Sequence, residues 1–195
     1  MAEATADFRH ETARLVLRDW RPEDWTAFIA HTNTPAVMRW LGGVQDADHF
    51  RLMADRFAEC RAAHGHCFWV VERRADGGSL GGELLGFCGL KRGNAPDCSF
   101  MGQFEIGWRL RQDAWGQGYA AEAARASLDL GFTRFAAPVI HAITVPGNRA
   151  SWTLMERLGL RRAPALDFRD SRFTGELNEV IAYSLTRAEW ESRLP

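Results

Sequence analysis

Lysine is nearly absent from this chain of 195 residues, because 23 of its 24 basic residues are arginine and Lys91 is the exception. This scarcity leaves almost no lysine to form a Schiff base, to titrate as a catalytic base or to bind phosphate in a P-loop. An excess of one charge is also missing, since 25 acidic residues oppose the 24 basic ones. A net charge of −1 provides no basic surface for DNA or RNA, so we expect no nucleic-acid partner.

Long apolar runs and closely spaced cysteine pairs are absent as well. No run of apolar residues is long enough to span a membrane, so we expect no membrane association. The N-terminal segment carries early acids and no apolar core, so we expect no secretory signal peptide. The cysteines form no Cys-x-x-Cys motif and are typical of reduced thiols, which indicates a cytoplasmic protein: Cys60, Cys67, Cys88 and Cys98.

A short metal-like tract is present at His64, His66 and Cys67. It has no second ligand pair at zinc spacing, so it indicates the end of a helix that runs into a strand. We therefore expect no metal site.

Apolar periodicity and turn residues outline one α/β (α+β) domain over residues 1–195, with a flexible N-terminus over residues 1–12. The pattern predicts about seven strands, at 14–18, 67–73, 84–90, 100–110, 139–145, 160–168 and 176–185. It predicts helices that begin near Pro22, span 46–64, follow Gly118, span 149–158 and follow Thr186. These elements indicate a mixed, mostly antiparallel sheet flanked by helices.

The most informative motif is a strand, a glycine turn and a helix over residues 103–125. Gly116 and Gly118 remove side chains where the chain turns into the helix. Free backbone N–H groups and the positive end of the helix dipole then make a site suited to a pyrophosphate.

Two other phosphate loops are weighed against this turn. A Walker A loop requires Gly-Lys-[Ser/Thr], which the position of Lys91 excludes. The glycine pattern of a Rossmann fingerprint is matched by Gly116, Gly118 and Ala121. That fingerprint needs an acid about 20 residues further on, and none occurs between Asp129 and Glu156.

The string DAWGQG at 113–118 resembles the phosphate motif of the GNAT N-acetyltransferases, commonly [Arg/Gln]-x-x-Gly-x-[Gly/Ala], with Asp113 as a departure. Five segments, in order along nearly the whole chain, resemble the ribosomal-protein N-acetyltransferase-like (RimJ/RimL-type) branch. They are RLVLRDWRPED at 14–24, EIGW at 105–108, WGQGYAAEA at 115–123, NRASWTLMERLGL at 148–160 and YSLTRAEW at 183–190. The resemblance implies a GNAT fold and an enzyme that transfers acetyl from acetyl-CoA to a primary amine, either a protein N-terminus or a small molecule.

The resemblance also implies where acetyl-CoA binds. The pantetheine arm lies along the strand at 100–110, bonded by the backbone of Trp108 and Leu110, while Asn148 contacts this arm and Ser151 lies near the sulfur. The pyrophosphate meets the turn, whose implied cofactor-binding residues are Trp115, Gly116, Gln117, Gly118, Tyr119 and Ala120. From spacing alone, Asn148 is equally an N-cap and Ser151 a residue of the first helical turn.

Glu105 is the candidate base and Ser151 the candidate acid. Amine acetylation requires a base, or a water chain, to deprotonate the attacking amine, and the leaving thiolate can require an acid. Glu105 precedes the cofactor-binding part of the strand, on the face opposite Ile106 and Trp108; the other interpretation is a surface carboxylate or a partner of Arg109. No cysteine or serine is presented with a histidine partner, so we expect direct transfer in a ternary complex.

Several questions stay open at this stage. The loops at 31–48 and 92–100 and the segment at 166–178 are expected to shape the acceptor pocket, whose occupant the sequence does not identify. The arginine that meets a CoA phosphate is left open among Arg109, Arg111 and Arg149, and a homodimer is possible. The alternative function is a non-catalytic acyl-CoA-binding or regulatory module on the same fold.

Overall fold

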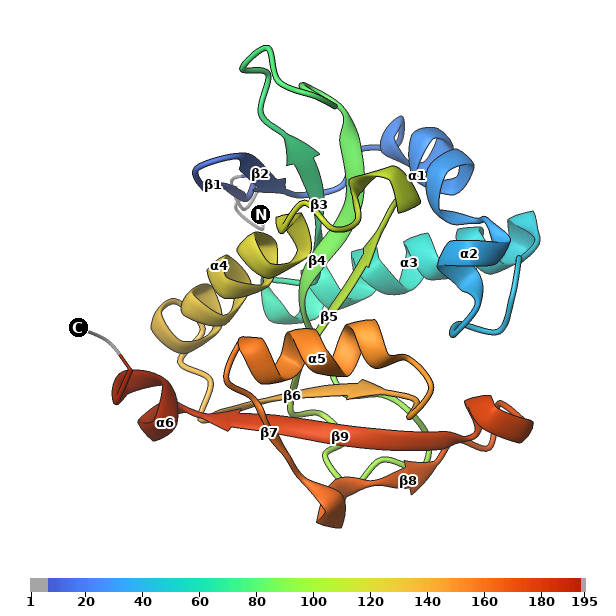
Figure 1. The fold of residues 1–195 in the computed structure, drawn as a ribbon, viewed down its shortest axis with the longest axis vertical. Coiled ribbons are helices and arrows are strands. Elements are labelled where there is room, and N and C mark those ends of the chain that lie inside the picture. Colours follow the sequence, from blue (N-terminus) through green and yellow to red (C-terminus); the bar gives the residue numbers. More distant parts are fainter. Residues whose placement is uncertain (1–6, 194–195) are drawn as a thin grey trace, which may run out of the picture.

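The residues that the structure describes, 7–193, form a sheet whose two halves separate in the middle (Figure 1). In this computed structural model the strand order is β1-β2-β3-β4-β5-β6-β9-β7, and β8 pairs with β9. Only β5 and β6 are parallel neighbours, which confirms a mixed, mostly antiparallel sheet flanked by helices. The strands are β1 (Arg9–Glu11), β2 (Leu15–Arg18), β3 (Phe68–Arg73), β4 (Leu84–Arg92), β5 (Phe104–Leu110), β6 (Val139–Thr144), β7 (Arg161–Arg162), β8 (Phe168–Arg169) and β9 (Glu179–Thr186). The helices are α1 (Asp24–Thr32), α2 (Pro35–Met38), α3 (Ala47–His64), α4 (Tyr119–Thr133), α5 (Arg149–Arg157) and α6 (Arg187–Glu191).

Nine strands lie among the described residues, where about seven were predicted. The strand expected over 100–110 begins only at Phe104, because Gly102 has a φ of +78° and its N–H closes a turn on Gly93 O (2.8 Å). The strand expected over 160–168 is divided into β7 and β8, since Pro164 begins a one-turn 3-10 helix between them.

The N-terminal segment differs from the expectation of flexibility over 1–12. Residues 9–11 form β1 and pair with β2, so this part of the expectation is wrong. The reason is burial, because Phe8 is only 5% exposed and its ring stacks on Trp69 at 4.4 Å. Residues 1–6 lie outside the described part of the chain.

The helices cover both faces of the sheet. A large apolar cluster joins α4 and α5 to one face, and an aromatic cluster around Phe28 of α1 and Phe57 of α3 covers the other. Small residues let α4 approach closely: a Cβ added at Gly131 would lie 2.6 Å from Ile140 Cδ1. Helix α4 therefore packs closely against the sheet.

The separation of the two sheet halves follows from the short pairing of β5 with β6. Only Phe104 and Glu105 of β5 have partners in β6, at Ile140 and His141. Beyond them β5 continues along β4, while β6 turns away to pair with β9, and Figure 1 shows the two directions crossing below α5. The second half of β5 therefore has one edge without a neighbouring strand.

The backbone direction along β5 decides which groups point to this edge. Arg111 N–H donates to Leu85 O of the β4 side at 2.8 Å. Because hydrogen-bond direction alternates along an antiparallel strand, the backbone groups of Trp108 and Leu110 point away from β4. The open edge therefore presents the two residues to which the sequence assigned backbone contacts with pantetheine.

Within residues 7–193, no helix combines the length and apolar character needed to cross a bilayer. The four cysteines are free thiols.

Candidate active site

The turn before α4 holds a row of free backbone donors. Gly116 and Gly118 both adopt left-handed backbone, with φ of +73° and +80°, and Gly118 is the N-cap of α4 without a side-chain cap. No group of the described residues accepts a hydrogen bond from the N–H groups of residues 116–120. Arg14 Nη1 donates to Gln117 O (2.9 Å), which fixes the turn through a carbonyl and leaves the N–H groups free. The turn can therefore bind an anion.

Asp113 and Arg111 neutralise each other beside this turn. Two hydrogen bonds of 2.6 and 2.7 Å join the carboxylate to the guanidinium and lower the pKa of Asp113, and Arg111 also donates to Glu83 (2.5 Å). Arg111 is thus already paired with two carboxylates of the protein, those of Asp113 and Glu83. Arg149 lies over the ring of Trp152, 5.7 Å from its centroid.

Two aromatic residues of the turn have structural contacts of their own. Trp115 Nε1 donates to Leu110 O at 2.9 Å, so this carbonyl at the open edge of β5 is already occupied. The buried Tyr119 accepts a hydrogen bond at its hydroxyl from Arg73 Nε (3.1 Å). At the open edge, the N–H and C=O of Trp108 and the N–H of Leu110 have no hydrogen-bond partner among the described residues.

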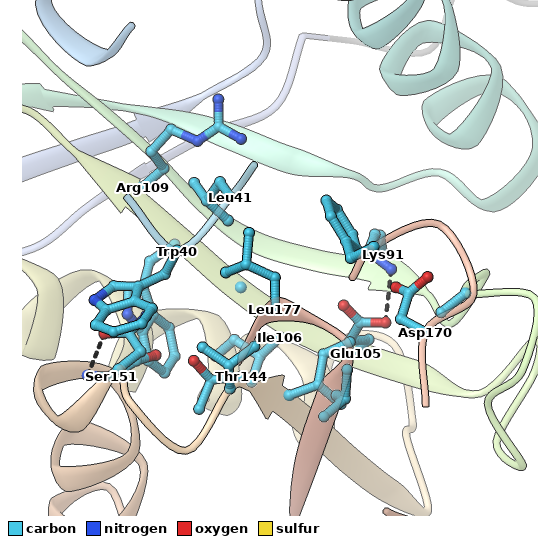
Figure 2. A pocket seen from close by; sticks show the side chains of 18 of the residues that line it. Trp40, Leu41, Lys91, Glu105, Ile106, Arg109, Thr144, Ser151, Asp170 and Leu177 are labelled. Carbon is cyan, nitrogen blue, oxygen red and sulfur yellow. Dashed lines mark hydrogen bonds and ion pairs between the residues drawn. The ribbon is translucent and has the colours of Figure 1, made fainter. Parts of the chain in front are cut away.

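Helix α5 faces the open edge of β5. Asn148 caps this helix, because its Oδ1 accepts from Ser151 N–H at 3.4 Å. The Ser151 hydroxyl has no hydrogen-bond partner among the described residues. Asn148 and Ser151 both line the cavity that lies between α5 and the sheet, as Figure 2 shows for Ser151.

This cavity has a volume of about 360 Å³. Glu105, Gly107, Trp108 and Arg109 of β5 contribute to it. The three segments expected to shape an acceptor pocket also supply its walls, namely 31–48 through Trp40 and Leu41, 92–100 through Asn94 and Ala95, and 166–178 through Asp170, Arg172, Phe173 and Leu177.

Glu105 lies in the cavity as half of a buried ion pair. Its side chain is 7% exposed and its Oε2 accepts from Lys91 Nζ at 2.6 Å (Figure 2). The interpretations as a surface carboxylate or as a partner of Arg109 are therefore wrong. Lys91 also donates to Asn94 Oδ1 (3.0 Å), and Glu105 Oε1 accepts no hydrogen bond from the described residues.

A second ion pair closes the same end of the cavity. Asp170 is 3% exposed and binds Arg172 through bonds of 2.8 and 2.6 Å, and this pairing lowers the pKa of Asp170. Asp170 and Lys91 are labelled beside Glu105 in Figure 2.

Sequence reasoning missed three of these charged residues: Lys91, Asp170 and Arg172. Lys91 could have been found, because it and Glu105 occur on consecutive strands of one antiparallel pair and are register partners. The approach of Asp170 and Arg172 depends on how the segment before β9 folds back, for which the sequence carries no local signal.

Residues 14–161 match the protein family described as Acetyltransferase (GNAT) domain. The chain belongs to the GNAT acetyltransferase family. Acetyl-CoA is the acetyl donor general to that family. In the described residues, no group of three or more His, Cys, Asp or Glu side chains is placed to hold a metal ion.

Three individual proteins are similar to this chain in sequence or in fold. The chain is 33% identical over 150 residues to the uncharacterized protein YkkB of Bacillus subtilis, which covers 76% of this chain and 83% of that protein. It is 27% identical over 186 residues to the uncharacterized N-acetyltransferase p20 of Bacillus licheniformis, covering 92% and 96% of the two chains. A spermidine N-acetyltransferase from Vibrio cholerae, solved in complex with CoA and spermine, superposes with a TM-score of 0.70 over 92% of this chain and 99% of that one. At 17% identity, this last likeness concerns the fold alone.

Proposed function

We propose that this GNAT protein is a RimJ/RimL-type N-acetyltransferase, which transfers acetyl from acetyl-CoA to a primary amine within a ternary complex. The observation that carries the proposal is the convergence of Glu105 and Ser151 on one cavity beside the open edge of β5. The relative p20, which covers nearly the whole chain, bears the name of an N-acetyltransferase.

The residues present fit two parts of acetyl-CoA, the pyrophosphate and the pantetheine arm. The free N–H groups of residues 116–120 suit the pyrophosphate, because a helix N-terminus stabilises negative charge. Pantetheine carries amide groups, and the N–H and C=O of Trp108 together with the N–H of Leu110 are available to bond them. Asn148 would contact the arm from α5 while it continues to cap the helix.

The acetyl transfer then requires residues of the chain to deprotonate the amine, to stabilise the oxyanion and to protonate the leaving thiolate. Glu105 Oε1 accepts a proton from the acceptor amine, directly or through water, so that the nitrogen lone pair attacks the thioester carbonyl carbon. A backbone N–H of β5 stabilises the developing oxyanion. The carbon–sulfur bond breaks, and the Ser151 hydroxyl hydrogen-bonds the CoA thiolate and relays a proton to it.

Thiol release from acetyl-CoA in the presence of a panel of primary amines tests the proposal. We expect at least one amine to accelerate release, with the N-acetyl product identified by mass spectrometry. Binding of acetyl-CoA without acceleration by any amine would instead support the non-catalytic acyl-CoA-binding module.

Saturating acetyl-CoA should raise the midpoint of thermal unfolding. A ligand that binds only the native state, at about 100 times its Kd, stabilises that state by about 2.7 kcal/mol. Differential scanning fluorimetry measures the shift, and ADP serves as a comparison because it has the diphosphate without pantetheine. An unchanged midpoint in acetyl-CoA, for protein that unfolds cooperatively, would contradict the cofactor site.

Gln117→Glu should weaken acetyl-CoA binding about 10-fold at low salt. The substitution preserves the N–H of residue 117 and places a carboxylate beside the proposed pyrophosphate site, where repulsion of about 1–2 kcal/mol is expected at an effective dielectric constant of about 20–40. Gln117→Ala is the matched control, because it too removes the hydrogen bond from Gln117 Nε2 to Asp113 O but adds no charge. Isothermal titration at two salt concentrations should show the loss shrinking as salt increases. Equal affinities for the two variants would contradict the assignment.

A further inference from the structure

Arg109 is a half-buried cation without a counter-ion among the described residues. It extends from β5, and its Nε and Nη1 are both fully buried without a hydrogen-bond partner. Its guanidinium lies near two aromatic rings, 5.8 Å from the centroid of Phe28 and 5.4 Å from that of Phe87. No carboxylate among residues 7–193 forms an ion pair with it.

The charge of Arg109 persists at neutral pH. Burial lowers the pKa of its guanidinium to about 10, so the group stays protonated in the physiological range. Aromatic faces compensate a buried cation only in part, and an unpaired charge in an apolar environment destabilises the protein. Such a group is expected where a ligand supplies the missing anion.

The residues around Arg109 do not supply that anion. His49 of α3 also lines the cavity, and burial together with the positive charge of Arg109 lowers the pKa of its imidazole. An imidazole is neutral or positively charged, so His49 cannot balance the guanidinium.

The other charges that line the cavity are already paired. Glu105 binds Lys91, and Asp170 binds Arg172. The lining residues thus include three cations and two carboxylates, and Arg109 is the one cation among them with no partner in the described chain. An excess of positive charge along the wall of a cavity favours an anionic ligand over a polycationic one.

We propose, on the basis of the acetyltransferase function above, that the acceptor is an amino acid-like amine whose carboxylate binds Arg109 while its amine faces the acetyl group near Glu105. In Figure 2, Arg109 lies at the end of the cavity away from Glu105, Lys91 and Asp170. The Cα atoms of Arg109 and Glu105 are four residues apart on a strand, about 13 Å. Two side chains at opposite ends of a cavity of about 360 Å³ suit a small amino carboxylic acid.

The carboxylate of the acceptor would pair with the guanidinium of Arg109 through hydrogen bonds. A carboxylate accepts N–H bonds from a guanidinium, and because Nε and Nη1 are enclosed by the protein, the carboxylate would meet Arg109 at Nη2. Binding would neutralise the unpaired charge and hold the amine at a set distance, so the carboxylate would act mainly on acceptor affinity. Arg109 is thus assigned as a specificity-determining residue.

The test compares acceptors that differ only in this charge. Thiol release is measured with the L-amino acids and with the ω-amino acids from β-alanine to 6-aminohexanoate, each beside its own carboxamide, and with spermidine. We expect the preferred acid to have a kcat/KM at least 10-fold above its carboxamide and above spermidine. Carboxamides or spermidine that match or exceed the acids would overturn the inference while leaving the acetyltransferase function standing, whereas no release with any amine would refute that function itself.

The variants Arg109→Met and Arg109→Lys test whether the preference for the acid over its carboxamide depends on Arg109. Arg109→Met should raise KM for the preferred acid at least 10-fold with a much smaller change in kcat, and should bring acid and carboxamide to similar kcat/KM. Arg109→Lys should restore part of the preference, because it returns the charge without the planar guanidinium. An acid preference that survives in Arg109→Met would overturn the assignment of this residue.

A measurement without turnover separates this role from a structural one. The thermal midpoint of ligand-free Arg109→Met should equal or exceed that of the wild type, since methionine fills the space without a buried unpaired charge. The preferred acid, added with CoA, should raise the midpoint of the wild type but not that of Arg109→Met. An equal rise in both proteins would contradict the proposed contact, and the acid–carboxamide comparison on the wild type stands even if the variant folds poorly.

Discussion

Glu105→Gln is expected to lower kcat about 100-fold or more and to change the affinity for acetyl-CoA by less than about 3-fold. General base catalysis contributes typically 10²–10⁴-fold, and glutamine retains the shape of the side chain but cannot accept the proton. The affinity should persist because the free donors of the 116–120 turn and the edge of β5 lie outside the Glu105 ion pair. The substitution also leaves the Lys91 ammonium without its carboxylate, so some loss of stability should accompany the loss of turnover.

Steady-state kinetics with a saturating acceptor and titration with acetyl-CoA measure the two quantities separately. In Glu105→Gln the acceptor must lose its proton to solvent, so activity should rise with pH into the range where free amines deprotonate. Glu59→Gln is the matched control, because Glu59 is exposed on α3 away from the cavity. Wild-type kcat in Glu105→Gln would remove this residue from the mechanism and favour a water chain as the base.

Gly116→Val should weaken acetyl-CoA binding about 30-fold. Gly116 has a φ of +73°, and a β-branched residue in this left-handed region costs about 1–3 kcal/mol. A Cβ there would meet no atom within 4 Å, so backbone strain is the one direct effect of the new side chain. The turn can relieve the strain by rotating its peptides, which would turn the N–H groups of residues 116–120 away from the pyrophosphate.

Gly65→Val supplies a matched control. Gly65 ends α3 with the same φ of +73°, and a Cβ at this position would also meet no atom within 4 Å. Both variants should therefore lose similar stability, a shift of several degrees in the unfolding midpoint for a chain of this size. Only Gly116→Val should lose acetyl-CoA affinity in isothermal titration. Equal affinity in the two variants would show that the turn does not bind the cofactor.

Local sequence patterns predicted the elements that build the cofactor side of the site. Gly116 and Gly118 predicted a turn with free backbone N–H groups that opens a helix, and the turn and the helix are both present. Alternation along β5 placed Glu105 on the face opposite Ile106, where it lines the cavity. These features depend on neighbours within a few residues, so the sequence alone contains the information.

The strand boundaries were less predictable. The alternation over 100–110 was read as one strand, yet a left-handed glycine and its turn delay β5 to Phe104. The short strands β1, β7 and β8 contain two or three residues each, too few to give a periodic signal. Their pairing depends on partners elsewhere in the sheet.

The near-absence of lysine illustrates the division between sequence and tertiary structure. The sequence alone excluded a P-loop and left the phosphate site to backbone donors, because both conclusions follow from which residues exist. Only the fold decided that the single lysine pairs with Glu105, that the Asp170–Arg172 pair lies at the same end of the cavity, and that Arg109 has no ion-pair partner among the described residues. Charge pairing depends on the distance and burial of side chains from separate segments, and these quantities arise only when β4, β5 and the segment before β9 are brought together.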